Sequence, residues 1–231
     1  MNNSDHIYSN LDLKKLLIPI IVEQLLSCLM GTVDTMMVSN VGSAAISAVS
    51  LVDSINVLVI QALSALAAGG AILCSQYLGS HNEKSANHAA RQVLLVMAVL
   101  STALSLLCLI FRVPMLRFIF GKVEADVMAN SQSYFLFTLL SFPFIGLYDA
   151  GASIMRAQND SRRPMIISVI SNFLNIGGNA ILIFGLNMGV SGAAISTLIS
   201  RIFCAVVVIS RRKGTYFRPQ LSVHPAGFFL N

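Results

Sequence analysis

Long hydrophobic stretches separated by short polar segments make up most of the sequence. Stretches of about 20 predominantly apolar residues match the length of a helix that crosses a bilayer. Six can be distinguished, at residues 15–38, 54–78, 92–111, 133–152, 165–185 and 189–210. Only the segment GLNMG separates the last two, so we expect them to form a tight helical hairpin. The pattern predicts an all-α, polytopic membrane protein with six transmembrane helices over residues 15–210.

The composition agrees with this pattern and argues against several classes of protein. Hydrophobic residues make up 55% of the chain and charged residues 11%, whereas soluble domains contain about 25% charged residues. There is no nucleophile–base pairing, HExxH motif or phosphate-binding loop to indicate an enzyme. The four cysteines lie inside apolar stretches without the spacing of metal ligands. We therefore expect neither a resident metal nor another cofactor.

The distribution of Lys and Arg predicts the orientation of the helices. With the N-terminus in the cytoplasm, the outer segments contain only Arg112, Arg117 and Lys122. The inner segments then contain eleven basic residues, namely Lys14, Lys15, Lys84, Arg91, Arg156, Arg162, Arg163, Arg211, Arg212, Lys213 and Arg218. Cytoplasmic loops are enriched in Lys and Arg in this way. We therefore expect residues 1–14 and 211–231 to be cytoplasmic, the latter as a linker or tail, and we expect no nucleic-acid partner.

The segment at residues 112–130 is the longest of the expected outer loops. Its sequence, RVPMLRFIFGKVEADVMAN, is partly amphipathic. It forms either an interfacial helix or a structured loop, and the pattern favours neither.

Four polar residues on three predicted helices lie at a similar depth. Asp34 precedes the outer end of the first helix by several residues, and Asn175 and Asn179 lie in the outer half of the fifth. Thr197 lies about eight residues into the sixth, which descends from the outside. At a rise of about 1.5 Å per residue, all four are roughly 9–15 Å below the outer boundary. An acid at this depth costs about 2.5–3.5 kcal/mol and marks a functional site by default, so we predict a cluster around Asp34.

Helical spacing places further residues on the same faces. Asn172 stands at i−3 from Asn175 on the fifth helix. Similar stripes on the first and fourth helices consist of Glu23, Ser27, Met30, Asp34 and Met37 and of Tyr134, Thr138 and Ser141. Because inward polar stripes in a membrane bundle usually surround a hydrated cavity, we predict that Glu23, Met30, Met37, Tyr134 and Asn172 line one. Helix packing explains a single Asn or a Met stripe equally well. Asp53 and Asp149 lie near predicted span ends, where we expect an interfacial position.

Three stretches of the sequence resemble multidrug and toxic compound extrusion (MATE) transporters. They are VDTMMVSNVG, GGAILCSQYLGSHNEKSANHAARQ and IMRAQNDSRRPMIISVISNFLNIGGNAILIFGLNMGVSGAAIST, and together they extend over nearly the whole chain. The resemblance implies one six-helix lobe of a two-lobe antiporter that exports organic cations across the cell membrane. Such a transporter works by alternating access and is driven by H⁺ or Na⁺. A second lobe, or another copy of the chain, is the implied partner.

The resemblance also implies roles for individual residues. The family's amino-terminal cation site corresponds to Asp34, Asn175, Asn179 and Thr197, the cluster that depth alone predicts. Some members have a second acid at the position of Asn179. With Asn there, Asp34 is the only formal charge in the cluster, which weakens the case for Na⁺ and leaves H⁺ coupling open.

Two other functions remain compatible with the sequence. A flippase for lipid-linked saccharides would have the same fold, but it would favour a more basic cavity than one with Arg201 as its only cation. A transport-inactive, half-length fragment is the other, because the resemblance covers a single lobe.

Overall fold

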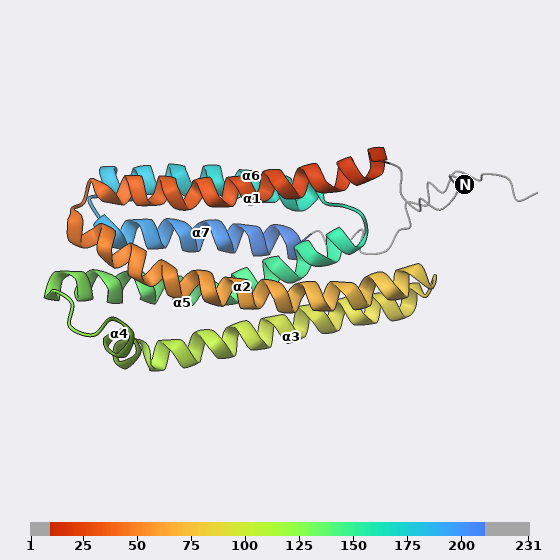
Figure 1. Ribbon diagram of the computed structural model, residues 1–231, viewed down its shortest axis with the longest axis horizontal. Coiled ribbons are helices and arrows are strands. Elements are labelled where there is room, and N and C mark those ends of the chain that lie inside the picture. The colour runs from red at the N-terminus through yellow and green to blue at the C-terminus, as the bar shows by residue number, and fades with distance from the viewer. Residues whose placement is uncertain (1–9, 211–231) are drawn as a thin grey trace, which may run out of the picture.

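The computed structural model describes residues 10–210, which form a bundle of long helices (Figure 1). The expected tail at residues 211–231 lies outside the described residues, as do residues 1–9 of the expected N-terminal segment. From residue 10 onward this segment is already helical. The boundaries at residues 14 and 211 therefore remain predictions.

The described residues contain six helices long and apolar enough to cross a membrane, which confirms the predicted fold class. They are α1 (Asn10–Ser39), α2 (Ser43–Gly79), α3 (Glu83–Ile110), α5 (Ala125–Ala157), α6 (Arg162–Asn179) with its extension η1 (Ala180–Gly185), and α7 (Gly189–Ser210). The short α4 (Arg112–Phe120) lies between α3 and α5. Several helices are longer than the apolar stretches that predict them. The helix α2 begins at Ser43 rather than at residue 54, and α5 begins at Ala125 rather than at residue 133.

Successive long helices run antiparallel. The connections at residues 40–42, 121–124 and 186–188 therefore lie at one end of the bundle, and those at residues 80–82 and 158–161 lie at the other (Figure 1). We call these the first end and the second end. The positive-inside pattern predicts that the first end is the outer one.

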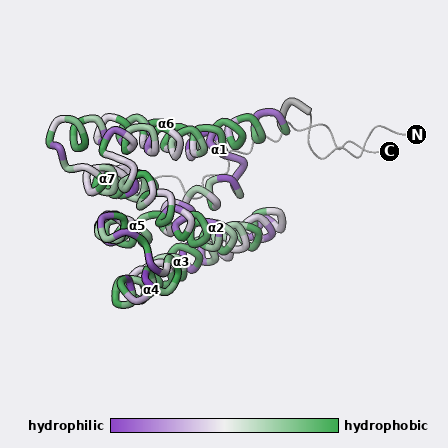
Figure 2. The backbone as a smooth tube through the Cα atoms, turned by 60° about the vertical axis from the view of Figure 1, so that its left-hand side comes forward, coloured by the Kyte–Doolittle hydropathy of each residue, from purple (hydrophilic) through white to green (hydrophobic). Residues whose placement is uncertain are grey.

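The helix α5 lies at the centre of the bundle. It packs most extensively against α2, α7 and α3, whereas α1 packs mainly against α6. The α1–α6 pair reaches the rest of the bundle largely through α7, as the two views show (Figures 1 and 2). The lobe is thus built from two helix groups that share α7.

Small residues allow this close packing around α5 and α7. A Cβ atom at Gly151 of α5 would collide with the Val208 side chain of α7. Gly178 of α6 faces Ser196 of α7 in the same way, with only 3.2 Å between its hypothetical Cβ and that of Ser196. Small residues at such contacts let the helix backbones approach each other in membranes.

The outside of the bundle is strongly hydrophobic. Large apolar side chains protrude from the long helices, including Leu58, Ile110 and Phe173, which are each at least 70% exposed. Hydrophobic residues predominate along the long helices, with hydrophilic residues interspersed (Figure 2). Such a surface suits lipid or another membrane-embedded partner.

Residues 112–130 contain a helix, as one of the two alternatives for this segment predicts. The helix α4 ends at Phe120 and is capped by Gly121, whose φ of 63° favours glycine. The residues from Ala125 onward belong to α5. The placement of α4 at a membrane interface remains a prediction.

Candidate functional site

A continuous chain of hydrogen bonds joins Asp34 to α6 and α7. Asn179 Nδ2 donates to Asp34 Oδ1 at 2.6 Å and to Asn175 Oδ1 at 3.2 Å. Asn175 Nδ2 in turn donates to Thr197 Oγ1 at 3.1 Å. All four side chains are buried, and the two Asn residues are fully enclosed. The structure therefore brings together the four residues that the sequence predicts as one cluster.

Local backbone geometry holds this cluster in place. Asn175 and Asn179 are four residues apart, so they lie one above the other on α6. Ser196 Oγ donates to the Asn175 carbonyl oxygen at 2.7 Å, and Thr197 Oγ1 donates to that of Ala193 at 3.0 Å. Immediately after Asn179 the helix changes to the π-helical η1, a form that is frequent at functional sites.

One acceptor in the cluster is left without a partner. Asn179 Oδ1 is buried and accepts no hydrogen bond from any described residue. Asn172 Nδ2, one turn before Asn175, is also buried and donates to none of the described residues. Buried polar atoms are normally satisfied, so these two atoms mark positions where a ligand or a rearranged side chain gains a hydrogen bond.

The predicted cavity residues do not all lie at this cluster. Glu23 lies eleven residues before Asp34 on α1, about 16 Å along the helix axis. Asn172 is buried on the Asn175 face of α6, whereas Met30 and Met37 are only partly buried. Met37 also packs against the hydrophobic core. The contact of the predicted cavity residues with a substrate remains a prediction.

Glu23 belongs to a separate polar group near the second end. Arg156 Nη2 lies 2.9 Å from both carboxylate oxygens of Glu23, and Tyr148 Oη donates to Oε1 at 2.9 Å. Tyr148 also donates to the Pro164 carbonyl oxygen at 3.2 Å. This group joins α1, α5 and the start of α6. The sequence gives no signal for it, because Arg156 lies beyond the expected span at residues 133–152, whereas α5 continues to Ala157.

A second acid, Asp53, lies well within α2 and not near the start of a span, which corrects the position expected from the sequence. Because α2 begins at Ser43, Asp53 lies ten residues into the helix rather than at its start. Tyr134 Oη and Asn56 Nδ2 both donate to Asp53 Oδ1 at 3.2 Å. The spacing of Asp53 and Asn56 at i and i+3 was the available signal. Tyr134, predicted as a cavity residue, is thus bound to this acid.

Asp149 also lies further inside than expected. It is eight residues before the end of α5 and only partly exposed. Its Oδ2 atom is buried and has no hydrogen-bond partner among the described residues.

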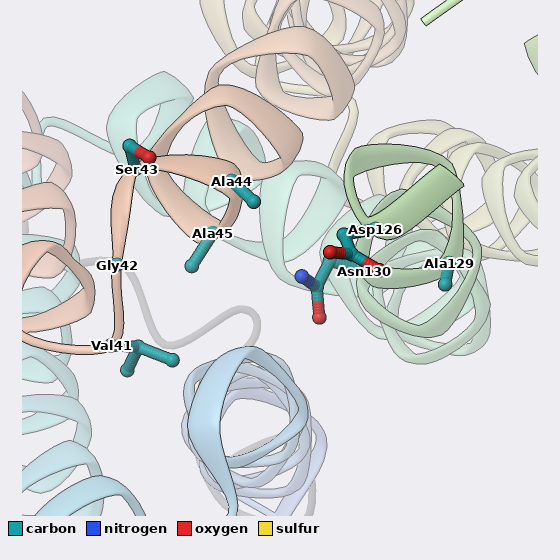
Figure 3. Close-up of a pocket in the computed structure, with 8 residues that line it drawn as sticks. All are labelled: Val41, Gly42, Ser43, Ala44, Ala45, Asp126, Ala129 and Asn130. Carbon is teal, nitrogen blue, oxygen red and sulfur yellow. The ribbon is translucent and has the colours of Figure 1, made fainter. Parts of the chain in front are cut away.

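A hollow of about 390 Å³ opens at the first end of the bundle. It lies between the α1–α2 turn and the first turns of α5, with Asn130 and Asp126 on one side and the turn opposite them (Figure 3). Its lining consists of Val41, Gly42, Ser43, Ala44, Ala45, Asp126, Ala129 and Asn130. The small side chains of the turn leave this space open at the end of the bundle nearest to Asp34.

Six membrane-length helices with a buried carboxylate bound by the Asn179 side-chain amide define a multi-pass membrane protein with a polar site inside its bundle. The family model MatE matches residues 19–181, more than half of the chain, and the chain belongs to this family.

Relatives and solved structures agree with this assignment. The chain is 30% identical over 202 residues to the uncharacterized transporter YisQ of Bacillus subtilis, covering 84% of this chain and 44% of that protein. It is 29% identical over 197 residues to the probable multidrug resistance protein NorM of Thermotoga maritima, covering 82% and 41% respectively. A MOP superfamily transporter from Pyrococcus furiosus superposes with a TM-score of 0.83 at 24% identity, over 91% of this chain and 47% of the other. The chain thus spans less than half the length of these proteins and has the fold of one lobe.

Proposed function

We propose that this chain forms one lobe of a cation-coupled antiporter that exports organic cations across the cytoplasmic membrane. The family assignment supports transport, and the multidrug resistance named for the Thermotoga maritima relative supports this class of cargo. The observation that carries the proposal is the buried Asp34 carboxylate, bound by Asn179 at 2.6 Å between α1 and α6. A carboxylate at this depth is the group that a coupling ion neutralises.

The amide of Asn179 suits a site whose charge changes during transport. Its Nδ2 donates to ionised Asp34, and its Oδ1 is buried without a partner. After a half-turn of the amide, this oxygen can accept the hydrogen bond of a protonated Asp34. Protonation therefore replaces the hydrogen bond from Asn179 to Asp34 with one from Asp34 to Asn179, and so changes the contact that joins α1 to α6. We infer that this exchange shifts α1 against α6 and displaces a bound cation.

The oxygen atoms available in this cluster suit a proton better than a sodium ion. Hard cations require several oxygen ligands. Asn175 Oδ1, Thr197 Oγ1 and Asp34 Oδ1 already accept hydrogen bonds within the cluster. This leaves Asp34 Oδ2 and Asn179 Oδ1 as its free oxygens. A single carboxylate is sufficient for a proton. We therefore place H⁺ before Na⁺ as the coupling ion.

Transport by this chain requires a second lobe in our proposal. Alternating access moves one repeat against another around a site between them. The chain spans less than half the length of its relatives, so the opposite wall comes from a further segment or from a second copy. Both ends of the described chain face the cytoplasm in this arrangement, as the Lys and Arg distribution indicates.

A proton-release measurement tests the coupling role without a second lobe. Ethidium, an organic cation, is added to the purified chain in a lightly buffered detergent solution near neutral pH. If cation and proton compete, ethidium binding releases protons from the wild-type chain and none from Asp34→Asn. Glu83→Gln, which neutralises an exposed acid in the first turn of α3, serves as the control and should behave like wild type. Undiminished proton release from Asp34→Asn would remove the basis of the proposal.

A further inference from the structure

Arg201 is a cation in the middle of a transmembrane helix. It lies twelve residues after Gly189 and nine before Ser210, about 18 Å and 14 Å from the two ends of α7. It is one turn beyond Thr197, on the face of α7 that carries the Asp34 cluster. Ionisable residues at such depth are costly and mark binding or transport pathways.

Most donors of this guanidinium are unused. Arg201 Nη1 donates to Ser141 Oγ of α5 at 2.6 Å. Its Nε and Nη2 atoms have no hydrogen-bond partner among residues 10–210, and neither atom is fully buried. No carboxylate of the described residues forms an ion pair with it. A guanidinium has five N–H donors arranged to bind a carboxylate or phosphate.

Two of the nearby acids are already bound by neutral groups. Asp53 accepts from Tyr134 and Asn56, and Asp34 accepts from Asn179. Both acids, together with Asp149 and Tyr134, are electrostatic neighbours of Arg201 without contacting it. A simple anion at Arg201 would therefore be repelled by three carboxylates, those of Asp53, Asp34 and Asp149. A molecule that also carries a positive charge would be attracted by them.

An orphan acceptor lies on the acidic side of this arrangement. Asn56 Nδ2 donates to Asp53, but Asn56 Oδ1 is buried without a partner among the described residues. The group therefore offers unused donors at Arg201 and unused acceptors at Asn56 and Asp53. These elements come from α2, α5 and α7, a different set of helices from the α1–α6 contact at Asp34.

We propose that Arg201, held by Ser141, binds the carboxylate or phosphate of a zwitterionic substrate whose cationic part lies toward Asp53 and Asn56. The inference rests on the proposed function and narrows its cargo from organic cations to molecules that carry both charges. Arg201 then selects the substrate, whereas Asp34 couples its movement to the ion.

A matched pair of dyes tests this assignment. Rhodamine B carries a cationic ring system and a free carboxylate. Its ethyl ester keeps the ring system but has an ethyl group on the carboxylate and therefore no negative charge. Both are titrated against the purified chain in nanodiscs by fluorescence anisotropy. Arg201→Gln should weaken rhodamine B binding about tenfold, the loss of one charge-assisted contact, and leave the ester within about twofold. Arg201→Lys, which keeps the charge but loses the planar fork, should lie between Gln and wild type.

Controls separate recognition from folding. Ser141→Ala removes the acceptor that positions the guanidinium and should cause a smaller, rhodamine B-specific loss. Arg163→Gln removes an equal charge near the start of α6, outside this group, and should change neither affinity. Far-UV circular dichroism reports that each variant is folded. If Arg201→Gln does not fold, Arg201→Lys is compared with wild type instead.

Each other outcome is decisive. Equal weakening of both dyes, or of neither, overturns the proposal, because Arg201 then acts only as an internal counter-ion of Asp53 and Asp34 or has no role in binding. Wild-type binding of the ester but not of rhodamine B rejects the zwitterion site and leaves the proposed function standing. Binding of neither dye counts against both.

Discussion

The contact between Glu23 and Arg156 makes a quantitative prediction about how α1 is held at the second end. Both contacts come from one nitrogen, Arg156 Nη2, at 2.9 Å from each carboxylate oxygen. The carboxylate is 9% exposed and the guanidinium side chain 29%. A hydrogen bond between charged groups contributes about 1.5–3 kcal/mol. Because a single nitrogen serves both oxygens and Arg156 is partly exposed, we expect a coupling of about 2 kcal/mol, near the lower limit of this range.

A double-mutant cycle measures this coupling. Glu23→Gln, Arg156→Gln and the double variant are compared by free energy of unfolding in mixed micelles with increasing dodecyl sulfate. Far-UV circular dichroism is the signal, because the chain contains no Trp. Arg156→Gln alone should be the most harmful, since it leaves the buried carboxylate with only Tyr148 as a donor.

A second ion pair on the same chain provides the matched control. Arg163 Nε lies 2.9 Å from Asp160 Oδ2, but its side chain is 46% exposed and the pair spans only three residues. Exposed pairs of this kind contribute about 0.2–1 kcal/mol. A Glu23–Arg156 coupling no larger than that of Asp160–Arg163 would refute the reasoning from burial and would mean that other contacts hold α1.

Three further predictions concern topology, hydrogen bonding and assembly. In intact cells, a membrane-impermeant maleimide should label Lys122→Cys and not Arg162→Cys in a background without native cysteines, and the reverse pattern would invert the orientation. Thr197→Ala should reduce ion-driven efflux about two- to tenfold, since it removes one hydrogen bond of about 0.5–1.5 kcal/mol at the edge of the cluster. Complete loss of efflux would show that Thr197 has a role beyond this hydrogen bond. The chain reconstituted strictly as a monomer should not export ethidium from liposomes, whereas dimeric or two-lobe preparations should, and robust monomer efflux would defeat the two-lobe requirement.

The Asp34 cluster is predictable from sequence because two independent regularities locate it. Helical periodicity fixes which residues share a face, and helix length fixes their depth, so the two together bring Asp34, Asn175, Asn179 and Thr197 to one level of the bundle. Neither regularity provides the connectivity. The order in which the amides bridge α1 to α7, and the unpaired Oδ1 of Asn179, depend on helix–helix distances that periodicity does not set.

Asp53 shows why another part of the site escapes prediction. Hydropathy indicates where a helix is apolar, not where its backbone hydrogen bonding begins. The helix α2 begins eleven residues before residue 54 and continues through the polar Ser50 and Asp53, so an acid assigned to a span end lies inside the bundle. The contact of Glu23 with Arg156 escapes prediction for a related reason. The helix α5 continues to Ala157, so Arg156 belongs to a helix that packs in the bundle rather than to an inner connecting segment.

Efflux by the Asp34→Asn variant tests the central claim most directly. The reading frame that contains this chain is expressed in bacteria lacking their own drug efflux pumps, and ethidium export is followed after an inward proton gradient is imposed, with a parallel sodium gradient as the alternative. Removing the acid lowers the cost of insertion, so the variant should reach the membrane in normal amount. The account predicts that Asp34→Asn abolishes gradient-driven export while Glu83→Gln exports as wild type does. Full export by the Asn variant at equal abundance would contradict it.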